Sequence, residues 1–461
     1  MKIGIVLDNP RRELDGVLIV AYHLMRRGHS VYVLPMYQQG YDVPWLDLDV
    51  IIVNYARINN RDFLASCKEL GIAVVVLDNE GGVIPEEGVK TPYGPDAISA
   101  NGLDQYIDHY LFWGERQYDY FRKRSPILPQ RLHVTGCPRY DFCHPRWQPT
   151  LHYPWRGYVL INTNFSAVNP QFTRTAEKEL EQFKSVGWGV EETHAHFKET
   201  AQLFEAYLDN LHKLAQRNTG RNFLLRPHPF EDYTVYERRF GDCPNVRVDG
   251  SGSVISMIRN STCTLHINCQ TAVETLMMGK LPVSLEYLNS DSARRRYPLP
   301  SHISYPAGNF EELHDIIQTP ERYAKKLPAM ALYQEHIEPL FYKNDGQAGM
   351  RVADIVEKVG HRQVKASGRL VRSLKGGFAK VAVVRLLQGA LSNVIGSRCV
   401  SVLRAKLNPR RGTKYVTLNN IQQRLGAISE ADSCSMKVRV HHARHPVLCL
   451  PMASIELKST G

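Results

Sequence analysis

The sequence predicts an α/β protein with two domains that face a cleft, each built on a doubly wound parallel sheet. Two observations predict it. Short apolar runs alternate with amphipathic helical segments over residues 1–145, and the alternation restarts after a Pro- and Trp-rich connector at 145–155. Strands that alternate with helices are typical of parallel sheets. The chain has 461 residues and 43% of them are apolar, which is enough for two full cores.

The domain boundaries follow this alternation. We expect a first domain over residues 1–150, a second over 151–330, crossover helices over 331–360 and a basic extension over 361–461. In open parallel sheets, ligands bind outside the carboxyl ends of the strands. The informative residues should therefore directly follow strands.

The first domain opens with an apolar run at residues 2–7, which predicts a strand. Apolar residues at helical spacing over 13–27 predict a helix that ends at Gly28. Residues 72–77 are almost wholly apolar, as expected for a strand that is buried on both faces. The other predicted elements are strands at 31–34, 50–53, 110–112 and 132–134 and a helix at 61–70.

The second domain repeats the architecture without repeating the sequence. It opens with a predicted strand at residues 158–161, followed by a long helix at 197–216. The further predicted elements are strands at 222–225, 246–248, 263–267 and 281–285 and helices at 253–259 and 271–278. Helical sequence over 328–359 is expected to cross back to the first domain.

Composition limits the compartment and the cofactors. The nine cysteines are scattered and form no C-x-x-C pair, which argues against a zinc site or a disulfide framework and fits a reducing compartment. No run of about 18 apolar residues predicts a membrane-spanning helix. The amino-terminal strand is too short and too soon charged for a signal peptide. We expect a cytoplasmic protein that needs no metal and no cofactor.

The net charge of +11 is concentrated in the extension. Residues 361–461 carry 18 Lys and Arg against three acids, whereas the rest carries 39 against 43. A folded body of net charge −4 argues against a nucleic-acid-binding protein. Apolar residues at helical spacing over 371–394, together with Lys375, Lys380 and Arg385, predict a basic amphipathic helix for an anionic membrane surface. A flexible extension is the alternative.

The sharpest motif is Arg226-Pro227-His228-Pro229, directly after a predicted strand. Each proline restricts its own backbone and drives the preceding residue toward extended geometry. The loop should therefore present a guanidinium and an imidazole in fixed directions. Both groups suit a phosphate, or the negative charge that develops on a departing phosphate. The alternative is a rigid turn with a surface histidine.

A second motif follows the strand predicted at 263–267. Gln270 and Thr271 open a helix, and Thr271 and Glu274 have the spacing of a capping box. The amino end of a helix after a strand is also suited to an anion. Thr271 and Glu274 would then bind the phosphate and the ribose of a nucleotide. The alternative is that they only cap the helix.

A third motif is Asp78-Asn79-Glu80-Gly81-Gly82, at the carboxyl end of an apolar strand. A carboxylate in this place could act as general base for an acceptor hydroxyl, and the glycines allow close approach of a ligand. An ordinary acidic turn is the alternative.

Three weaker signals complete the candidates. Asp47-Leu48-Asp49 precedes a strand, so we interpret it as a turn and not as a D-x-D metal motif. Ser253 ends a Gly/Ser loop and either touches phosphate or, the favoured reading, caps a helix. Residues 136–141 follow a strand near the domain boundary and could shape the floor of the cleft.

Together, the motifs at residues 78–81, 136–141, 226–229 and 271–274 resemble those of the bacterial surface carbohydrate biosynthesis proteins. These are similar to capsule glycosyltransferases, among them Kdo transferases, polysialyltransferases and bacterial sialyltransferases. The resemblance covers about residues 1–360. It implies a GT-B fold of two Rossmann-type domains and a nucleotide-activated sugar donor, often CMP-linked.

The resemblance also implies roles. Glu80 or Asp78 would be the catalytic base, and His228 would assist the departing phosphate. Gln270 and Thr271 stand where the relatives carry a Ser/Thr pair for the donor phosphate, so the first hydroxyl of that pair is missing here.

We therefore expect a glycosyltransferase of surface-polysaccharide or capsule synthesis that acts on a glycan or lipid-linked acceptor. Arg226, His228 and Thr271 would hold the donor phosphate, and Glu274 the ribose. Two rival functions remain: a nucleotide-sugar epimerase of the same fold, and a non-catalytic protein of polysaccharide assembly. The expected location is the cytoplasm, with peripheral binding at the inner face of the cell membrane.

Overall fold

The computed structural model describes residues 1–36, 38–78, 94–173, 175–178, 181, 190–296, 298–359, 416–434, 436–444, 446, 449 and 451–460. They divide into two compact units, one of Met1–Thr150 with Glu338–Gly461 and one of Leu151–Ile337. In the described part of the chain, no helix is long and apolar enough to cross a membrane.

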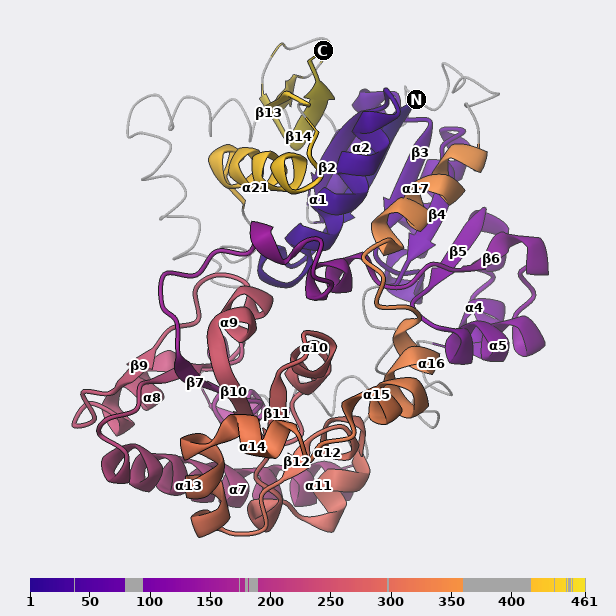
Figure 1. The fold of residues 1–461 in the computed structure, drawn as a ribbon. Coiled ribbons are helices and arrows are strands. Elements are labelled where there is room, and N and C mark those ends of the chain that lie inside the picture. The colour runs from indigo at the N-terminus through magenta and orange to yellow at the C-terminus, as the bar shows by residue number, and fades with distance from the viewer. Residues whose placement is uncertain are drawn as a thin grey trace, which may run out of the picture. The chain divides into compact units, whose positions relative to one another are not determined.

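Unit 1 is built on a sheet that has eight strands among the described residues, in the order β13-β14-β2-β1-β3-β4-β5-β6 (Figure 1). The strands β1 to β6 are parallel, as predicted, because a helix or loop crossing separates each from the next. The first elements are β1 (Lys2–Leu7), α1 (Pro10–Arg26), β2 (Ser30–Pro35), α2 (Gln39–Leu46), β3 (Val50–Val53), α3 (Arg61–Glu69) and β4 (Ala73–Leu77). They are followed by α4 (Pro95–Ala100), β5 (His109–Phe112), α5 (Glu115–Arg124) and β6 (Leu132–Val134).

The chain returns to unit 1 after unit 2 and completes it. The returning elements are α16 (Glu338–Phe341), α17 (Ala348–Val359), α21 (Leu418–Ala431), β13 (Val438–Arg444) and β14 (Pro451–Ser459). Helix α17 packs on α1, and Asp141 accepts hydrogen bonds from the backbone N–H groups of Ala348 and Gly349 at its first turn, at 2.8 and 2.7 Å. Those bonds satisfy donors that a helix leaves unpaired at its start.

The carboxyl-terminal end of the chain differs from the separate basic extension that we expected. Strand β14 pairs antiparallel with β2, and α21 packs on α1 (Figure 1). Ile455 and Leu457 are buried in the core, and Tyr32 donates a hydrogen bond to Glu456 at 2.9 Å. Residues 416–460, where described, therefore belong to unit 1. The helix predicted at 371–394 lies outside the described residues.

Unit 2 carries a parallel sheet of six strands among its described residues, in the order β12-β11-β10-β7-β8-β9. Its first elements are β7 (Tyr158–Asn162), α7 (Val190–Arg217), β8 (Phe223–Arg226), α8 (Tyr233–Arg239), β9 (Val246–Val248), α9 (Val254–Asn260), β10 (Ser261–His266) and α10 (Thr271–Met277). The remaining elements are β11 (Leu281–Ser284), α11 (Asp291–Arg296), α12 (Pro298–His302), β12 (Tyr305–Pro306), α13 (Phe310–Gln318), α14 (Pro320–Ala324) and α15 (Ala329–Leu332).

The sheet of unit 2 is buried on both faces. Along β7, Val159 and Ile161 belong to the core on one face, and Tyr158 and Leu160 to the core on the other. Successive residues of a strand point to opposite faces, so a strand that is covered on both sides must be apolar throughout. This is why the short apolar runs of the sequence predict the central strands correctly.

Candidate functional site

The strand order of unit 2 has one point where the direction of winding reverses, between β7 and β10. Strands β7, β8 and β9 proceed to one side of it, and β10, β11 and β12 to the other. In open parallel sheets, ligands bind in the crevice outside the carboxyl ends of the strands at such a point. In this chain, the segments that follow β7, β8 and β10 meet there.

The carboxyl end of β7 connects directly to the segment after β10. Asn162 is the last residue of β7 and is 2% exposed. Its Nδ2 donates a hydrogen bond to Oγ1 of Thr271 at 2.9 Å. Its Oδ1 is buried and accepts no hydrogen bond from the described residues. A buried amide oxygen without a donor is costly.

The next residue connects β7 to the segment after β8. Thr163 Oγ1 accepts a hydrogen bond from the backbone N–H of His228 at 3.0 Å and donates one to the carboxylate of Glu231. Consecutive Cα atoms lie about 3.8 Å apart. Asn162 and Thr163, which are consecutive in the chain, therefore connect the end of β7 to the Thr271 hydroxyl and to the backbone of the His228 loop.

Arg226 ends β8 and pairs in register with Asn162 of β7. It is 8% exposed, so its guanidinium lies largely away from solvent. Burial raises the pKa of the nearby Cys269 thiol, while the charge of Glu274 raises it further and that of Arg226 lowers it. The charges of Arg226 and Glu274 thus have opposite effects on the pKa of the same buried thiol.

The imidazole of His228 is partly exposed, and one of its nitrogens is occupied. The backbone N–H of Phe230 donates to His228 Nδ1 at 3.3 Å, and the Phe230 ring lies edge-on at 5.4 Å. A nitrogen that accepts a hydrogen bond carries no proton. In the neutral ring the proton is therefore on Nε2, which can donate to an anion.

Helix α10 begins at Thr271, as predicted, but the predicted capping box is wrong. Gln270 is the residue at the N-cap position, and its side chain makes no capping hydrogen bond. Thr271 Oγ1 instead accepts from Asn162 and donates to Cys269 Sγ at 3.2 Å. Glu274 is 4% exposed. The strand end, and not a helix cap, therefore orients the threonine.

Ser253 takes the N-cap position of α9 but makes no capping hydrogen bond, so the side-chain cap that we favoured is wrong. It follows β9, which is separated from β7 by β8. Asp47, Leu48 and Asp49 form the short connection between α2 and β3. Asp47 is left-handed at φ 53°, and Asp49 accepts the backbone N–H of Lys2 at 2.7 Å.

A strained residue marks the segment after β10. Asn268 has φ 48°, in the left-handed region that few non-glycine residues occupy. Its side chain is held from two sides: Nδ2 donates to Asn289 Oδ1 at 2.9 Å, and Oδ1 accepts from Asn289 Nδ2 at 3.1 Å and from Ser301 at 3.2 Å. These contacts stabilise the unusual backbone geometry at the strand end.

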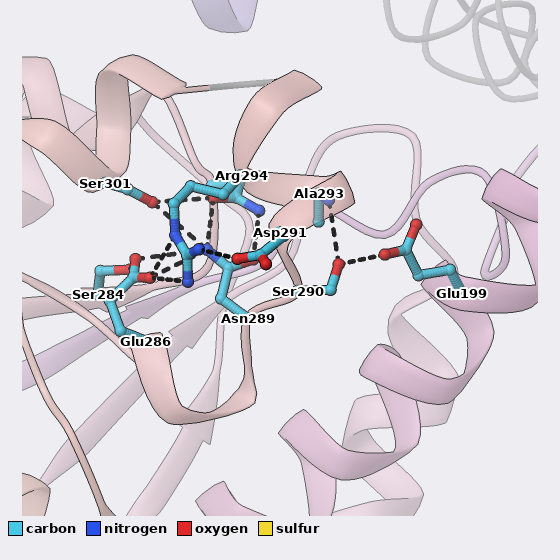
Figure 2. A network of polar contacts seen from close by, with 10 residues as sticks. Glu199, Ser284, Glu286, Asn289, Ser290, Asp291, Ala293, Arg294 and Ser301 are labelled. Atoms are coloured by element: carbon cyan, nitrogen blue, oxygen red, sulfur yellow. Dashed lines mark hydrogen bonds and ion pairs between the residues drawn. The ribbon is translucent and has the colours of Figure 1, made fainter.

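Asn289 also belongs to the polar network that follows β11 (Figure 2). Glu286 lies at its centre and accepts from Arg294 Nε at 3.0 Å and from Ser284 at 2.6 Å. Burial raises the pKa of Glu286, but the donors from Ser284, Ser301 and Arg294 outweigh it and hold that pKa below its usual value. An ionised Glu286 thus anchors Asn289, and through it Asn268.

In unit 1, one of the two acidic candidates can be located. Asp78 is 4% exposed, accepts a hydrogen bond from Tyr110 at 3.0 Å and lies 3.9 Å from the Arg57 guanidinium. Glu80 lies outside the described residues. The carboxylate of Asp78 is therefore already engaged within the core of unit 1.

Unit 1 has its own reversal of winding, between β1 and β3, and a pocket lies there. Glu13 lines it and accepts the backbone N–H groups of Asp8 and Asn9, at 3.0 and 3.2 Å, which ties down the turn between β1 and α1. Cys137, Pro138 and Arg139 of the 136–141 segment also line this pocket.

The sequence analysis missed Asn162, Thr163 and Asn164, which join the other segments. Asn164 completes the set, because its Nδ2 donates to the backbone oxygen of Asn268 at 3.3 Å. Three consecutive polar residues directly after the strand predicted at 158–161 were the available signal. The order of the strands gives that position its importance, and strand order is not readable from the sequence.

Comparison with known proteins shows the fold alone. No protein-family model matches the sequence, and no curated protein matches it. Among solved structures, the wall teichoic acid polymerase TagF soaked with CDPG is 12% identical, with a TM-score of 0.50 over 77% of this chain and 88% of that one. The UDP-GlcNAc 2-epimerase of Neisseria meningitidis, bound to UDP-GlcNAc, is 10% identical, with a TM-score of 0.48 over 78% of this chain and all of the other.

The epimerase of Methanocaldococcus jannaschii is also 10% identical, with a TM-score of 0.47 over the same shares of the two chains. The chain has a GT-B-like α/β fold with two parallel sheets, as predicted from the sequence. TagF shares this fold.

Proposed function

We propose that the chain is a glycosyltransferase of surface-polysaccharide synthesis, and that unit 2 binds its nucleotide-activated sugar donor. One observation carries the proposal. At the point where the winding of the sheet reverses, Asn162 bonds to Thr271 and pairs in register with Arg226, and Thr163 bonds to the backbone of His228. A guanidinium, an imidazole N–H and a hydroxyl form a set of donors that suits phosphate oxygens.

In the proposed reaction, a carboxylate of the acidic motif takes the proton of the acceptor hydroxyl. The acceptor oxygen bonds to the anomeric carbon while the bond from that carbon to the donor phosphate breaks. The phosphate leaves with the electron pair, and Arg226 and His228 stabilise its charge. We assign the base to Glu80, because Tyr110 and Arg57 already engage Asp78.

One further feature supports the donor assignment. Glu274, on the first turn of α10, is suited to the hydroxyls of a ribose. Since α10 has only seven residues, side chains must supply most of the binding energy.

The proposal is tested by nucleotide binding. Thermal shift with CMP, CDP, UDP and GDP should identify one nucleotide that raises the melting temperature of the wild-type protein. His228→Ala should lose that shift, and turnover with it, and keep its own melting temperature. His152→Ala is the matched control, because His152 is an exposed histidine of the same unit. If no nucleotide stabilises the protein, or if His228→Ala keeps near-normal turnover, the donor site is refuted.

A second measurement separates the rival functions. A transferase should release the nucleotide only when an acceptor is present, whereas an epimerase would convert the free nucleotide sugar without one. CDP-glycerol belongs in the donor panel, because TagF was solved with CDPG. Binding of polysaccharide without binding of any nucleotide would instead favour a protein of polysaccharide assembly.

A further inference from the structure

A fully buried carboxylate lies behind the His228 loop. Glu231 is 0% exposed and accepts hydrogen bonds from the hydroxyl groups of Thr163 and Tyr236, the latter at 2.5 Å, and from the backbone N–H of Phe165. Burial raises its pKa, and these donors oppose the shift. A buried carboxyl group is costly and persists only where such bonds compensate for it.

The same carboxylate fixes the direction of the Thr163 hydroxyl. Because the threonine gives its only proton to Glu231, its oxygen is left to accept from the backbone N–H of His228, at 3.0 Å. The backbone N–H of Glu231 in turn donates to the carbonyl of His228, at 2.9 Å. Both backbone groups of His228 are thus held, one through Thr163 and one by Glu231.

This arrangement governs the imidazole as well. The turn closed by Glu231 brings the backbone N–H of Phe230 to Nδ1 of His228, so the ring is presented with Nε2 as its donor. Thr163 is 2% exposed, so neither it nor Glu231 is open to a ligand. The pair can act on a ligand only through His228.

We propose that Thr163 and Glu231 are positioning residues, which hold His228 as a donor toward the phosphate of the nucleotide. The inference rests on the proposed function, because it gives His228 a ligand to meet. It goes beyond that function in assigning the geometry of the histidine to two buried residues from different strand ends.

The test uses the full chain with Thr163→Val, Thr163→Ser, Glu231→Gln and Tyr236→Phe. Valine matches threonine in shape but lacks the hydroxyl, serine keeps the hydroxyl, and Tyr236→Phe removes a bond to Glu231 that does not involve His228. Two readouts apply: the imidazole resonances of His228 by NMR, assigned with His228→Ala, and the affinity for the nucleotide found by thermal shift.

We expect Thr163→Val and Glu231→Gln to shift the His228 resonances and their pH midpoint. They should weaken nucleotide binding roughly three- to tenfold, the size of one lost buried hydrogen bond. Thr163→Ser should restore both readouts, and Tyr236→Phe should change both less than Thr163→Val does. If Glu231→Gln fails to fold, the two Thr163 variants decide alone.

The outcomes separate this inference from the proposed function. If the wild-type protein binds nucleotide and Thr163→Val alters neither readout, the positioning role is overturned. It is also overturned if Tyr236→Phe changes the His228 resonances as much as Thr163→Val does. If the resonances respond as expected but no nucleotide binds the wild-type protein, the geometry of the loop stands and the proposed function fails.

Discussion

Single polar side chains at strand ends decide how the segments of unit 2 meet. Asn162 and Thr163 follow one another in the chain, yet they reach the segment after β10 and the segment after β8, respectively. A residue at the end of a central strand can do this because its neighbours on both sides also end there. The motif with two prolines was found from the sequence because proline leaves a local signature. Asn162 and Thr163 leave only a short polar run, and the strand order that gives this run its importance is not readable from the sequence.

Another residue of this region predicts a pH dependence. His266 ends β10, is 0% exposed, and bonds through Nε2 to Ser304 at 2.8 Å. Burial lowers its pKa from 6.5 to about 4. Between pH 6.5 and pH 4, His266 is protonated in the unfolded chain but stays neutral in the folded protein. The contribution of the neutral His266 to the free energy of unfolding is therefore complete above pH 6.5 and is lost as the pH falls toward 4.

The free energy of unfolding of the wild-type protein should fall between pH 7 and pH 4. We expect His266→Gln to make this fall smaller by up to about 3 kcal/mol. Denaturant unfolding at several pH values measures this, with the exposed His152→Gln as control. If the wild type and His266→Gln lose the same free energy of unfolding between pH 7 and pH 4, the lowered pKa of His266 is refuted.

At the scale of elements, the sequence predicts best where burial is complete. Strands β1, β3, β4 and β7 are short apolar runs, and the structure places each of them in the centre of a sheet. Helix α2 was missed because it contains Pro44, a residue that disfavours helix interiors. Strand β13 was missed because its pattern is polar, with His441 and His442 in its middle, as is usual for a strand at the edge of a sheet.

The role of β14 in unit 1 leads to a stability prediction. Leu457 is 0% exposed and pairs with Val31 of β2, whereas the side chain of the next residue, Lys458, is 48% exposed. Leu457→Ala should cost about 2–5 kcal/mol, because it leaves a cavity in the core. Lys458→Ala, on the other face of the strand, should cost under about 1 kcal/mol.

Denaturant unfolding of the two variants gives the answer. Matching transitions for Leu457→Ala and Lys458→Ala would mean that β14 adds nothing to the core of unit 1. The basic segment would then behave as the separate extension that the sequence predicted.

At the scale of the whole molecule, the carboxyl-terminal segment is both strongly basic and, where described, part of a folded sheet. Residues 361–461 carry a net charge of +15, yet the described part of this segment completes a sheet with an amino-terminal strand. Deleting the entire segment would therefore remove a structural strand together with the basic residues. The membrane proposal needs a variant that changes charge alone.

Substitution of Lys375, Lys380 and Arg385 by Gln is that variant. Each basic residue near an anionic surface contributes about 1 kcal/mol to binding. At low salt, the triple variant should therefore bind vesicles that contain phosphatidylserine roughly tenfold or more weakly than the wild type. Its melting temperature and its turnover on a soluble acceptor should be unchanged. Cosedimentation measures the binding, and no binding by the wild-type protein at low salt would remove the proposed peripheral location.

The central claim is that a nucleotide binds where the winding of the unit 2 sheet reverses. Amide hydrogen exchange tests it most directly, with and without the nucleotide that gives the largest thermal shift. The account predicts protection confined to three segments, residues 162–165, 226–231 and 268–275, and its loss in His228→Ala. Protection at the pocket between β1 and β3 of unit 1, with none in those three segments, would contradict it.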